Sequence, residues 1–173
     1  MHFHTKELST IMKLYCAREL LLNALNIANK AISNKTTLDI LKCVLLTASN
    51  GKFIVTATDL EIGIQSAPIP ATIEEEGSIA LSASFFTEII RKVNGENVLI
   101  QTNEKYETFI SCGFSDFKIM GQNGEEFPTL PEVEKKQEYK ILQSNLKDMI
   151  RQTIFSITQD ESKPILTGEL LEF

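Results

Sequence analysis

The chain has 173 residues, of which 43% are apolar and 23% charged, and its formal net charge at pH 7 is −6. This length suits one complete domain and part of a second. No apolar run approaches the roughly 18 residues that a membrane span needs, so we expect a cytoplasmic protein with no membrane partner. The acidic balance excludes a protein that holds nucleic acid by bulk attraction, because such binding needs clustered Lys and Arg.

From Leu14 onward the apolar residues first alternate with other residues and then follow a helical spacing. Alternation at every second residue predicts a strand, and apolar residues at i, i+3, i+4 and i+7 predict a helix with one buried face. The positions that carry this pattern are Leu14, Cys16, Leu21, Ala24, Leu25 and Ala28. The same layout recurs twice, which predicts an internal repeat of strand, helix and further strands.

The second copy lies 65 residues further along, and the third follows the first at an offset of 125 residues without a gap. The second copy occupies the corresponding slots with Ile79, Leu81, Phe86, Ile89, Ile90 and Val93. The third copy occupies them with Tyr139, Ile141, Leu146, Met149, Ile150 and Thr153. We expect Ser84 to cap the second helix, and Ser144 or Asn145 the third, because short polar side chains accept free backbone N–H groups.

Further apolar runs read as strands, at residues 40–48, 52–57, 60–66, 97–103, 108–113 and 116–121. The dipeptide Asn50-Gly51 predicts a hairpin between the first two, because both residue types tolerate positive φ. Together the runs predict an α+β fold, in which antiparallel sheets carry two helices per domain, packed on one side.

The segment 125–138 interrupts this pattern with two prolines and a run of charges, which is typical of a linker. We therefore expect a first domain over 12–133, and a linker with the beginning of a second domain over 134–173. The third copy holds too little chain to bury a core of its own, so we expect a piece of a longer protein. Residues 1–11 stand outside the repeat, as a leader or an added extension.

The residues give little sign of catalysis. Both histidines, His2 and His4, lie in the segment 1–11, so the repeats lack the imidazole of a Ser/His or Cys/His site. A weak metal site at these histidines is the alternative to an unstructured leader. The cysteines form no CxxC pair and suit reduced, buried thiols: Cys16, Cys43 and Cys112. No glycine-rich phosphate loop is present, so we expect no catalytic residue, no metal and no cofactor.

The stretch FIVTATDLEIGIQ, residues 53–65, holds two carboxylates, Asp59 and Glu61, which could be catalytic acids or turn residues. Its apolar residues have odd numbers before Thr58 and even numbers after it. A strand cannot change face without a turn or bulge, so a reversal is expected at Thr58-Asp59. Asp59 would then accept backbone N–H bonds, and Glu61 would face outward on the next strand. A hydrolase that uses both carboxylates is the alternative.

Six segments resemble the bacterial sliding clamp family, the beta subunit of DNA polymerase III, in order and at the expected spacing. They are MKLYCARELLLNAL, KTTLDILKCVLL, TATDLEIGI, FFTEIIRKV, EEFPTLP and DESKPILTGELLE. The resemblance covers the chain from Met12 to its end. It implies a DNA-clamp fold in a non-catalytic processivity factor, whose full-length homodimeric ring encircles duplex DNA and tethers the replicative polymerase, with the clamp loader as a further partner. The alternative is a clamp-like interaction or dimerisation module that does not hold DNA.

The resemblance also implies site residues. Lys35 and Arg91 match basic positions that contact DNA phosphates, and helical position adds Lys30 and Lys92. The alternative for these cations is that they complement helix dipoles. In place of family cations this chain has Ser84, Phe85 and Asp160.

Ring closure is expected to use four apolar residues that match the family's dimer interface: Phe117, Ile119, Ile89 and Val93. The alternative is that all four belong to the domain's own core. Three residues map near the family's pocket for partner peptides, which is only partly present: Lys163, Ile165 and Leu166.

Overall fold

The computed structural model describes residues 10–33, 36–131, 137–160 and 162–172. The chain divides into two compact units between Leu130 and Pro131. No helix in these ranges is long and apolar enough to cross a membrane.

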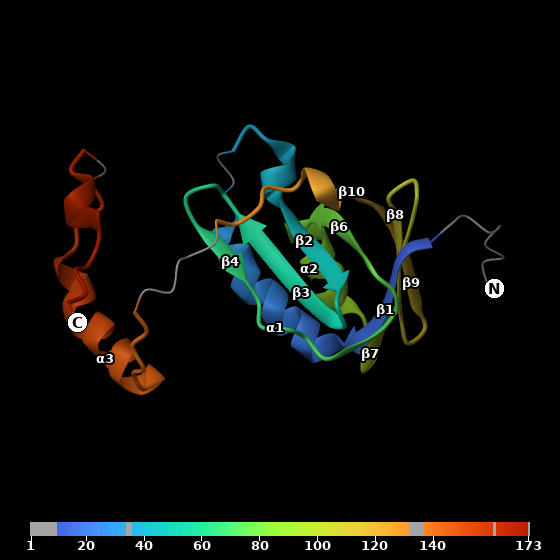
Figure 1. The fold of residues 1–173 in the computed structure, drawn as a ribbon, viewed down its shortest axis with the longest axis horizontal. Coiled ribbons are helices and arrows are strands. Elements are labelled where there is room, and N and C mark those ends of the chain that lie inside the picture. Colours follow the sequence, from blue (N-terminus) through green and yellow to red (C-terminus); the bar gives the residue numbers. More distant parts are fainter. Residues whose placement is uncertain (1–9, 34–35, 132–136, 161, 173) are drawn as a thin grey trace. The chain divides into compact units, whose positions relative to one another are not determined.

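The first unit contains two antiparallel five-stranded sheets (Figure 1). One sheet has the order β5 (Ala71–Glu75), β1 (Thr10–Ala17), β7 (Asn97–Asn103), β8 (Glu107–Cys112) and β9 (Ser115–Met120). The other has the order β10 (Gln122–Asn123), β6 (Gly77–Ser82), β2 (Cys43–Ser49), β3 (Lys52–Thr58) and β4 (Gly63–Gln65). With the helices α1 (Arg18–Ala28) and α2 (Ala83–Lys92), this confirms the predicted α+β class.

Both helices of the first unit follow the repeat pattern. β1 leads directly into α1, and β6 leads directly into α2. The slots predicted to be apolar are buried in each copy: Leu21, Ala24, Leu25 and Ala28 in the first, and Phe86, Ile89, Ile90 and Val93 in the second. The helices also contact each other, and the amide nitrogen Nδ2 of Asn29 donates to Thr87 Oγ1 at 2.9 Å.

The predicted helix caps are wrong. α2 begins at Ala83, so Ser84 lies inside its first turn, and no side chain caps it. α3 (Gln143–Thr153) likewise begins before Ser144 and Asn145, after Leu142. A capping residue needs a non-helical backbone, which all three predicted residues lack. In α2 the N-cap position is held by Ser82, the last residue of β6, whose side chain makes no capping hydrogen bond.

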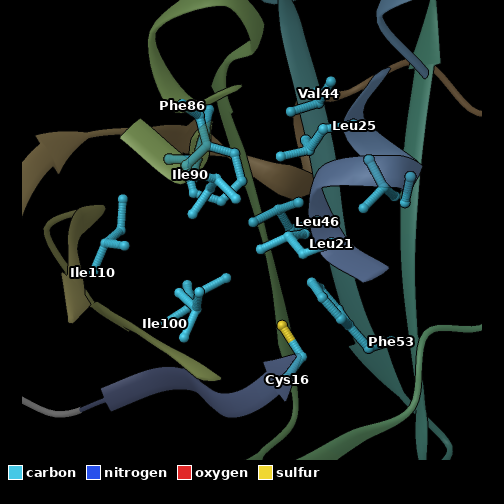
Figure 2. Close-up of a cluster of buried hydrophobic side chains, with 14 of the residues drawn as sticks. Cys16, Leu21, Leu25, Val44, Leu46, Phe53, Phe86, Ile90, Ile100 and Ile110 are labelled. Atoms are coloured by element: carbon cyan, nitrogen blue, oxygen red, sulfur yellow. The ribbon is translucent and has the colours of Figure 1, made fainter. Parts of the chain in front are cut away.

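One hydrophobic core joins the two copies of the repeat (Figure 2). The labelled side chains come from both helices and both sheets, and none is more than 4% exposed: Cys16, Leu21, Leu25, Val44, Leu46, Phe53, Phe86, Ile90, Ile100 and Ile110. Burying one such aliphatic or aromatic side chain stabilises a fold by roughly 1.5–3 kcal/mol. The core therefore fixes α1 and α2 against the sheets and leaves only their outer sides accessible.

The predicted hairpin at Asn50-Gly51 is confirmed. The φ angles of these residues are 51° and 67°, and Ser49 pairs with Lys52 across the turn. Two positive φ values are typical of a two-residue turn whose twist matches the flanking strands.

The second unit contains α3 and two short 3-10 helices, Ile154–Ser156 and Pro164–Thr167. None of the α3 side chains is buried, and Met149 is 53% exposed. The strand expected at Tyr139 and Ile141 does not form, because the described part of this unit offers no strand for it to pair with.

Candidate nucleic-acid interface

The accessible side of α2 ends in two cations. Arg91 and Lys92 occupy its last turn, where a positive charge also complements the helix dipole. Ser84, Phe85 and Glu88 lie on this same side, opposite the buried positions, at spacings of three, four and seven residues. The cations are thus presented to solvent by a helix that the core holds in place.

Both cations are paired with one carboxylate. Arg91 Nη1 donates to Glu88 Oε1, and Lys92 Nζ lies 3.2 Å from Glu88 Oε2. The spacing of three and four residues between Glu88 and the two cations is the sequence signal for these pairs. The end of α2 therefore carries one net positive charge in place of two.

The accessible side of α1 contributes little charge. Lys30 follows the helix in the 3-10 turn Asn29–Ala31, is exposed, and forms no ion pair with a described residue. Leu20 and Ile27 are exposed apolar residues, 44% and 52% accessible, and Glu19 is an exposed acid. Lys35, the remaining predicted contact, lies outside the described residues.

Arg18, the first residue of α1, is half-buried and donates to two backbone carbonyls. Its Nε donates to the carbonyl oxygen of Gly95 at 3.1 Å, and its Nη1 lies 3.5 Å from the carbonyl oxygen of Ile90. This arginine serves the fold, where it binds carbonyls at and beyond the end of α2.

The four residues predicted for the dimer interface lie on the edge strand β9 and at the end of α2, and three of them are buried within the domain. Ile119, Ile89 and Val93 are 7%, 6% and 3% exposed and belong to the domain's own core, which was the alternative reading. Of the four predicted residues only Phe117 is exposed, at 39%. The sequence could not separate the two readings, because an apolar residue is required equally by a core and by an interface.

Two exposed apolar residues near this edge were missed. Phe114 lies between β8 and β9 and is fully exposed, and Met120 ends β9 with 64% of its surface accessible. Phe114 directly follows Gly113, whose φ is 60°, so the Cys-Gly-Phe sequence was a signal for a turn that projects an aromatic side chain.

Asp59 is a turn residue, as predicted. Its Oδ1 accepts hydrogen bonds from the backbone N–H groups of Glu61 at 3.1 Å and Ile62 at 2.8 Å. Thr58 Oγ1 donates to the Ile62 carbonyl at 2.9 Å, which closes the same turn. Among the described residues, no three His, Cys, Asp or Glu side chains are grouped so as to hold a metal ion.

Two details of that prediction are wrong. Glu61 is exposed but lies within the turn, because β4 begins only at Gly63. Leu60 and Ile62 are 62% and 55% exposed, although the parity of the apolar residues had placed them inward. The turn spans more residues than a tight reversal, so the alternation does not resume until Ile64, which packs against the core.

The second unit has a hollow of about 440 Å³ that includes two of the three predicted pocket residues, Ile165 and Leu166. Met149 of α3 and Leu170 also line it, whereas Lys163 does not. Asp160, which stands where the family has a cation, accepts hydrogen bonds from Ser162 in a turn. These hydrogen bonds lower the pKa of the Asp160 carboxyl.

The model of the DNA polymerase III beta subunit N-terminal domain matches residues 12–131. The chain belongs to this family. A curated beta sliding clamp of Staphylococcus epidermidis is 36% identical over 166 residues, which make up 91% of this chain and 44% of that protein. The chain thus spans less than half the length of this relative.

Solved structures give the same family. A protein of Eubacterium rectale described as a DNA polymerase III beta subunit has 42% identity and a TM-score of 0.87, over 91% of this chain and 43% of that one. The DNA polymerase sliding clamp of Bacillus subtilis has 35% identity and a TM-score of 0.85, with the same two shares. The beta subunit fold is therefore shared over nearly the whole chain.

Proposed function

We propose that this chain forms the first domain and the opening of the second domain of a DNA sliding clamp. In the complete protein, the clamp would encircle duplex DNA as a homodimeric ring and tether the replicative polymerase without performing catalysis. The observation that carries the proposal is the family match over residues 12–131, together with two pseudo-repeated helices, of which α2 ends in Arg91 and Lys92 and α1 is followed by Lys30.

The proposed DNA contact is made by Arg91, Lys92, Lys30 and Lys35. Lys and Arg at such positions bind phosphate oxygens and carry no sequence information. The contact is expected to be weak, since Glu88 pairs with two of these cations and the chain is acidic overall. Weak contact suits a ring, because a closed ring holds DNA by topology and must slide along it.

Dimerisation is proposed to use the free edge of β9. An unpaired edge presents a row of N–H and C=O groups that another strand can bind. Phe117 would meet the second protomer, while Ile119, Ile89 and Val93 support the edge from within the core. The peptide tails of the polymerase and the clamp loader are proposed to dock in a pocket to which Ile165 and Leu166 contribute, with Lys163 near by.

The test compares retention of the full-length clamp on circular and on linear DNA. After loading onto a nicked plasmid, the protein should stay bound through a high-salt wash and be lost once the plasmid is linearised. The matched control is the same plasmid cut before loading. Equal retention on both forms, or none on either, would contradict encirclement and favour an interaction module that does not hold DNA.

A further inference from the structure

One carboxylate is shared by both cations at the end of α2. Each of its oxygens meets a different partner: Oε1 accepts from Arg91, and Oε2 lies 3.2 Å from Lys92 Nζ. The side chains of Glu88, Arg91 and Lys92 are 45%, 52% and 76% exposed, so all three face solvent where a phosphate could approach.

The rest of α2 offers no substitute for these charges. Its other accessible residues on this side, Ser84 and Phe85, are uncharged, and Arg18 is occupied by backbone carbonyls. Of the cations described on the two helices and the 3-10 turn after α1, Arg18 and Lys30 form no ion pair with a described residue, and Arg18 donates to backbone carbonyls instead. The ion pairs of Glu88 thus engage both of the cations that α2 presents to solvent.

We propose that Glu88 attenuates DNA contact by competing with phosphate for Arg91 and Lys92. The inference rests on the proposed function, because it concerns the strength of that same contact. Glu88 accepts from one guanidinium nitrogen of Arg91 and places its other oxygen beside Lys92, so a phosphate that binds these cations competes with the carboxylate for their charge. Exposed ion pairs are weak, so a phosphate displaces Glu88 at a modest loss of affinity. The carboxylate then rebinds the cations as the DNA moves on, which keeps the contact short-lived.

The plain alternative is that Glu88 only stabilises the helix. A glutamate placed three or four residues before Arg or Lys supports an isolated helix through the same pairs. On that account, removing the carboxylate would lower the melting temperature and leave affinity for DNA unchanged. If Glu88 attenuates DNA contact, removing its carboxylate should raise the affinity for DNA. The change in affinity on removing the carboxylate therefore distinguishes the two accounts.

The experiment measures binding of the 173-residue chain to a short fluorescent duplex by anisotropy, over a series of salt concentrations. The Glu88→Gln variant should bind roughly two- to fivefold more tightly at low salt, the range expected for release of an exposed pair. Its affinity should also fall more steeply with salt, because more counterions are released per duplex bound. Glu88→Ala should behave alike, and its high helix propensity guards against a folding defect.

Glu19→Gln is the matched control. It removes the same charge from an exposed position on α1, and Glu19 forms no ion pair with a described residue. It should raise affinity less than Glu88→Gln does. Equal gains in the two variants would overturn the proposal, since they would reflect net charge alone. No gain in Glu88→Gln, or no binding by either wild type or Glu88→Gln, would overturn it as well.

A double variant, Arg91→Ala with Lys92→Ala, separates this inference from the proposed function. If it weakens binding while Glu88→Gln has no effect, attenuation fails and the phosphate contact stands. If the double variant binds as wild type does, the proposed contact itself fails. Adding Glu88→Gln to the double variant should give no more gain than Glu19→Gln gives, because the cations that Glu88 competes for are gone.

Discussion

The guanidinium of Arg18 donates from Nε to the carbonyl oxygen of Gly95 at 3.1 Å, across 77 positions of sequence. The backbone N–H of Arg18 also donates to the Glu96 carbonyl at 2.8 Å. The start of the first helix thereby binds the segment that leaves the second helix. Carbonyl groups in the last turn of a helix lack hydrogen-bond donors within the helix. Arg18 supplies a donor to one of them, the Ile90 carbonyl in the last turn of α2.

Replacing Arg18 should therefore loosen the junction between the two repeats. We expect Arg18→Ala to lower the free energy of unfolding by about 1.5–3 kcal/mol, the range for hydrogen bonds made by a charged group. Arg18→Lys should recover part of this loss, because an ammonium keeps the charge but lacks the fork. Urea denaturation measures both effects.

Lys52→Ala serves as the control for Arg18, since Lys52 is an exposed cation in β3 with no ion pair to a described residue. Its effect should stay within about 0.5 kcal/mol. An Arg18→Ala variant as stable as this control would show that the bonds to Gly95 and Ile90 contribute nothing.

Gly77 marks a place where the two sheets approach closely. A Cβ atom there would lie 2.0 Å from the carbonyl oxygen of Ile11, which is a backbone atom that cannot swing away. Gly77→Ala should therefore displace β1 from β6 and cost several kcal/mol, beyond the usual range for one substitution. Thermal unfolding followed by circular dichroism should show a large drop in melting temperature.

The control for Gly77 is Gly168→Ala in the second unit. Nothing lies within 4 Å of the added Cβ, and the φ of Gly168 is −123°. This variant should unfold as wild type does. Unchanged stability in Gly77→Ala would mean that the close approach of β1 and β6 relaxes at no cost.

Periodicity alone predicted both helices of the first unit and most strands, because burial of one face imposes a fixed spacing on the apolar residues. β5 was missed, since this edge strand reads ATIEE and needs only one partner and little burial. The same logic explains Ile89 and Ile119: spacing shows that a side chain is buried, but does not show against which chain. Contacts between sequence-distant groups, such as Arg18 with Gly95, leave no local pattern.

The turn at Asp59 gives a prediction that separates turn chemistry from catalysis. Asp59→Asn retains an oxygen that accepts from the N–H groups of Glu61 and Ile62, so stability and DNA retention should change little. Asp59→Val removes that acceptor and should cost about 1–2 kcal/mol. Glu61→Gln is the control, since its exposed side chain is not needed by the turn. Loss of function with an intact fold in Asp59→Asn would reopen a catalytic role.

Burial raises the pKa of the Cys16 thiol to about 12 from a usual value of 9.0, and the nearby Cys112 adds to the rise. The unfolded thiol ionises at lower pH than the folded one, so the folded state binds more protons between these values. This contribution to stability is complete below about pH 9 and is lost as the pH rises toward 12. Wild type should lose up to about 1.4 kcal/mol per pH unit more than Cys16→Ala in that window.

Urea denaturation at a series of alkaline pH values checks this, with the two proteins compared at each pH. The comparison cancels the lysines and tyrosines that titrate in the same range. Parallel curves for wild type and Cys16→Ala would show that the thiol ionises equally well in the folded state.

Phe117 and Ile119 should respond oppositely to a charge, although they lie on the same face of β9. Phe117 is 39% exposed at an unpaired edge, so Phe117→Asp should preserve the fold. Ile119 is 7% exposed within the core, and Ile119→Asp should unfold the domain, because a buried carboxylate without a partner is costly. If the full-length protein dimerises through β9 as proposed, sedimentation should show a dimer for wild type and a folded monomer for Phe117→Asp. Met120→Asp places a charge on the opposite face of the strand and tests whether a charge anywhere on this edge is enough to break the dimer. A dimer that survives Phe117→Asp with unchanged affinity would move the interface away from β9.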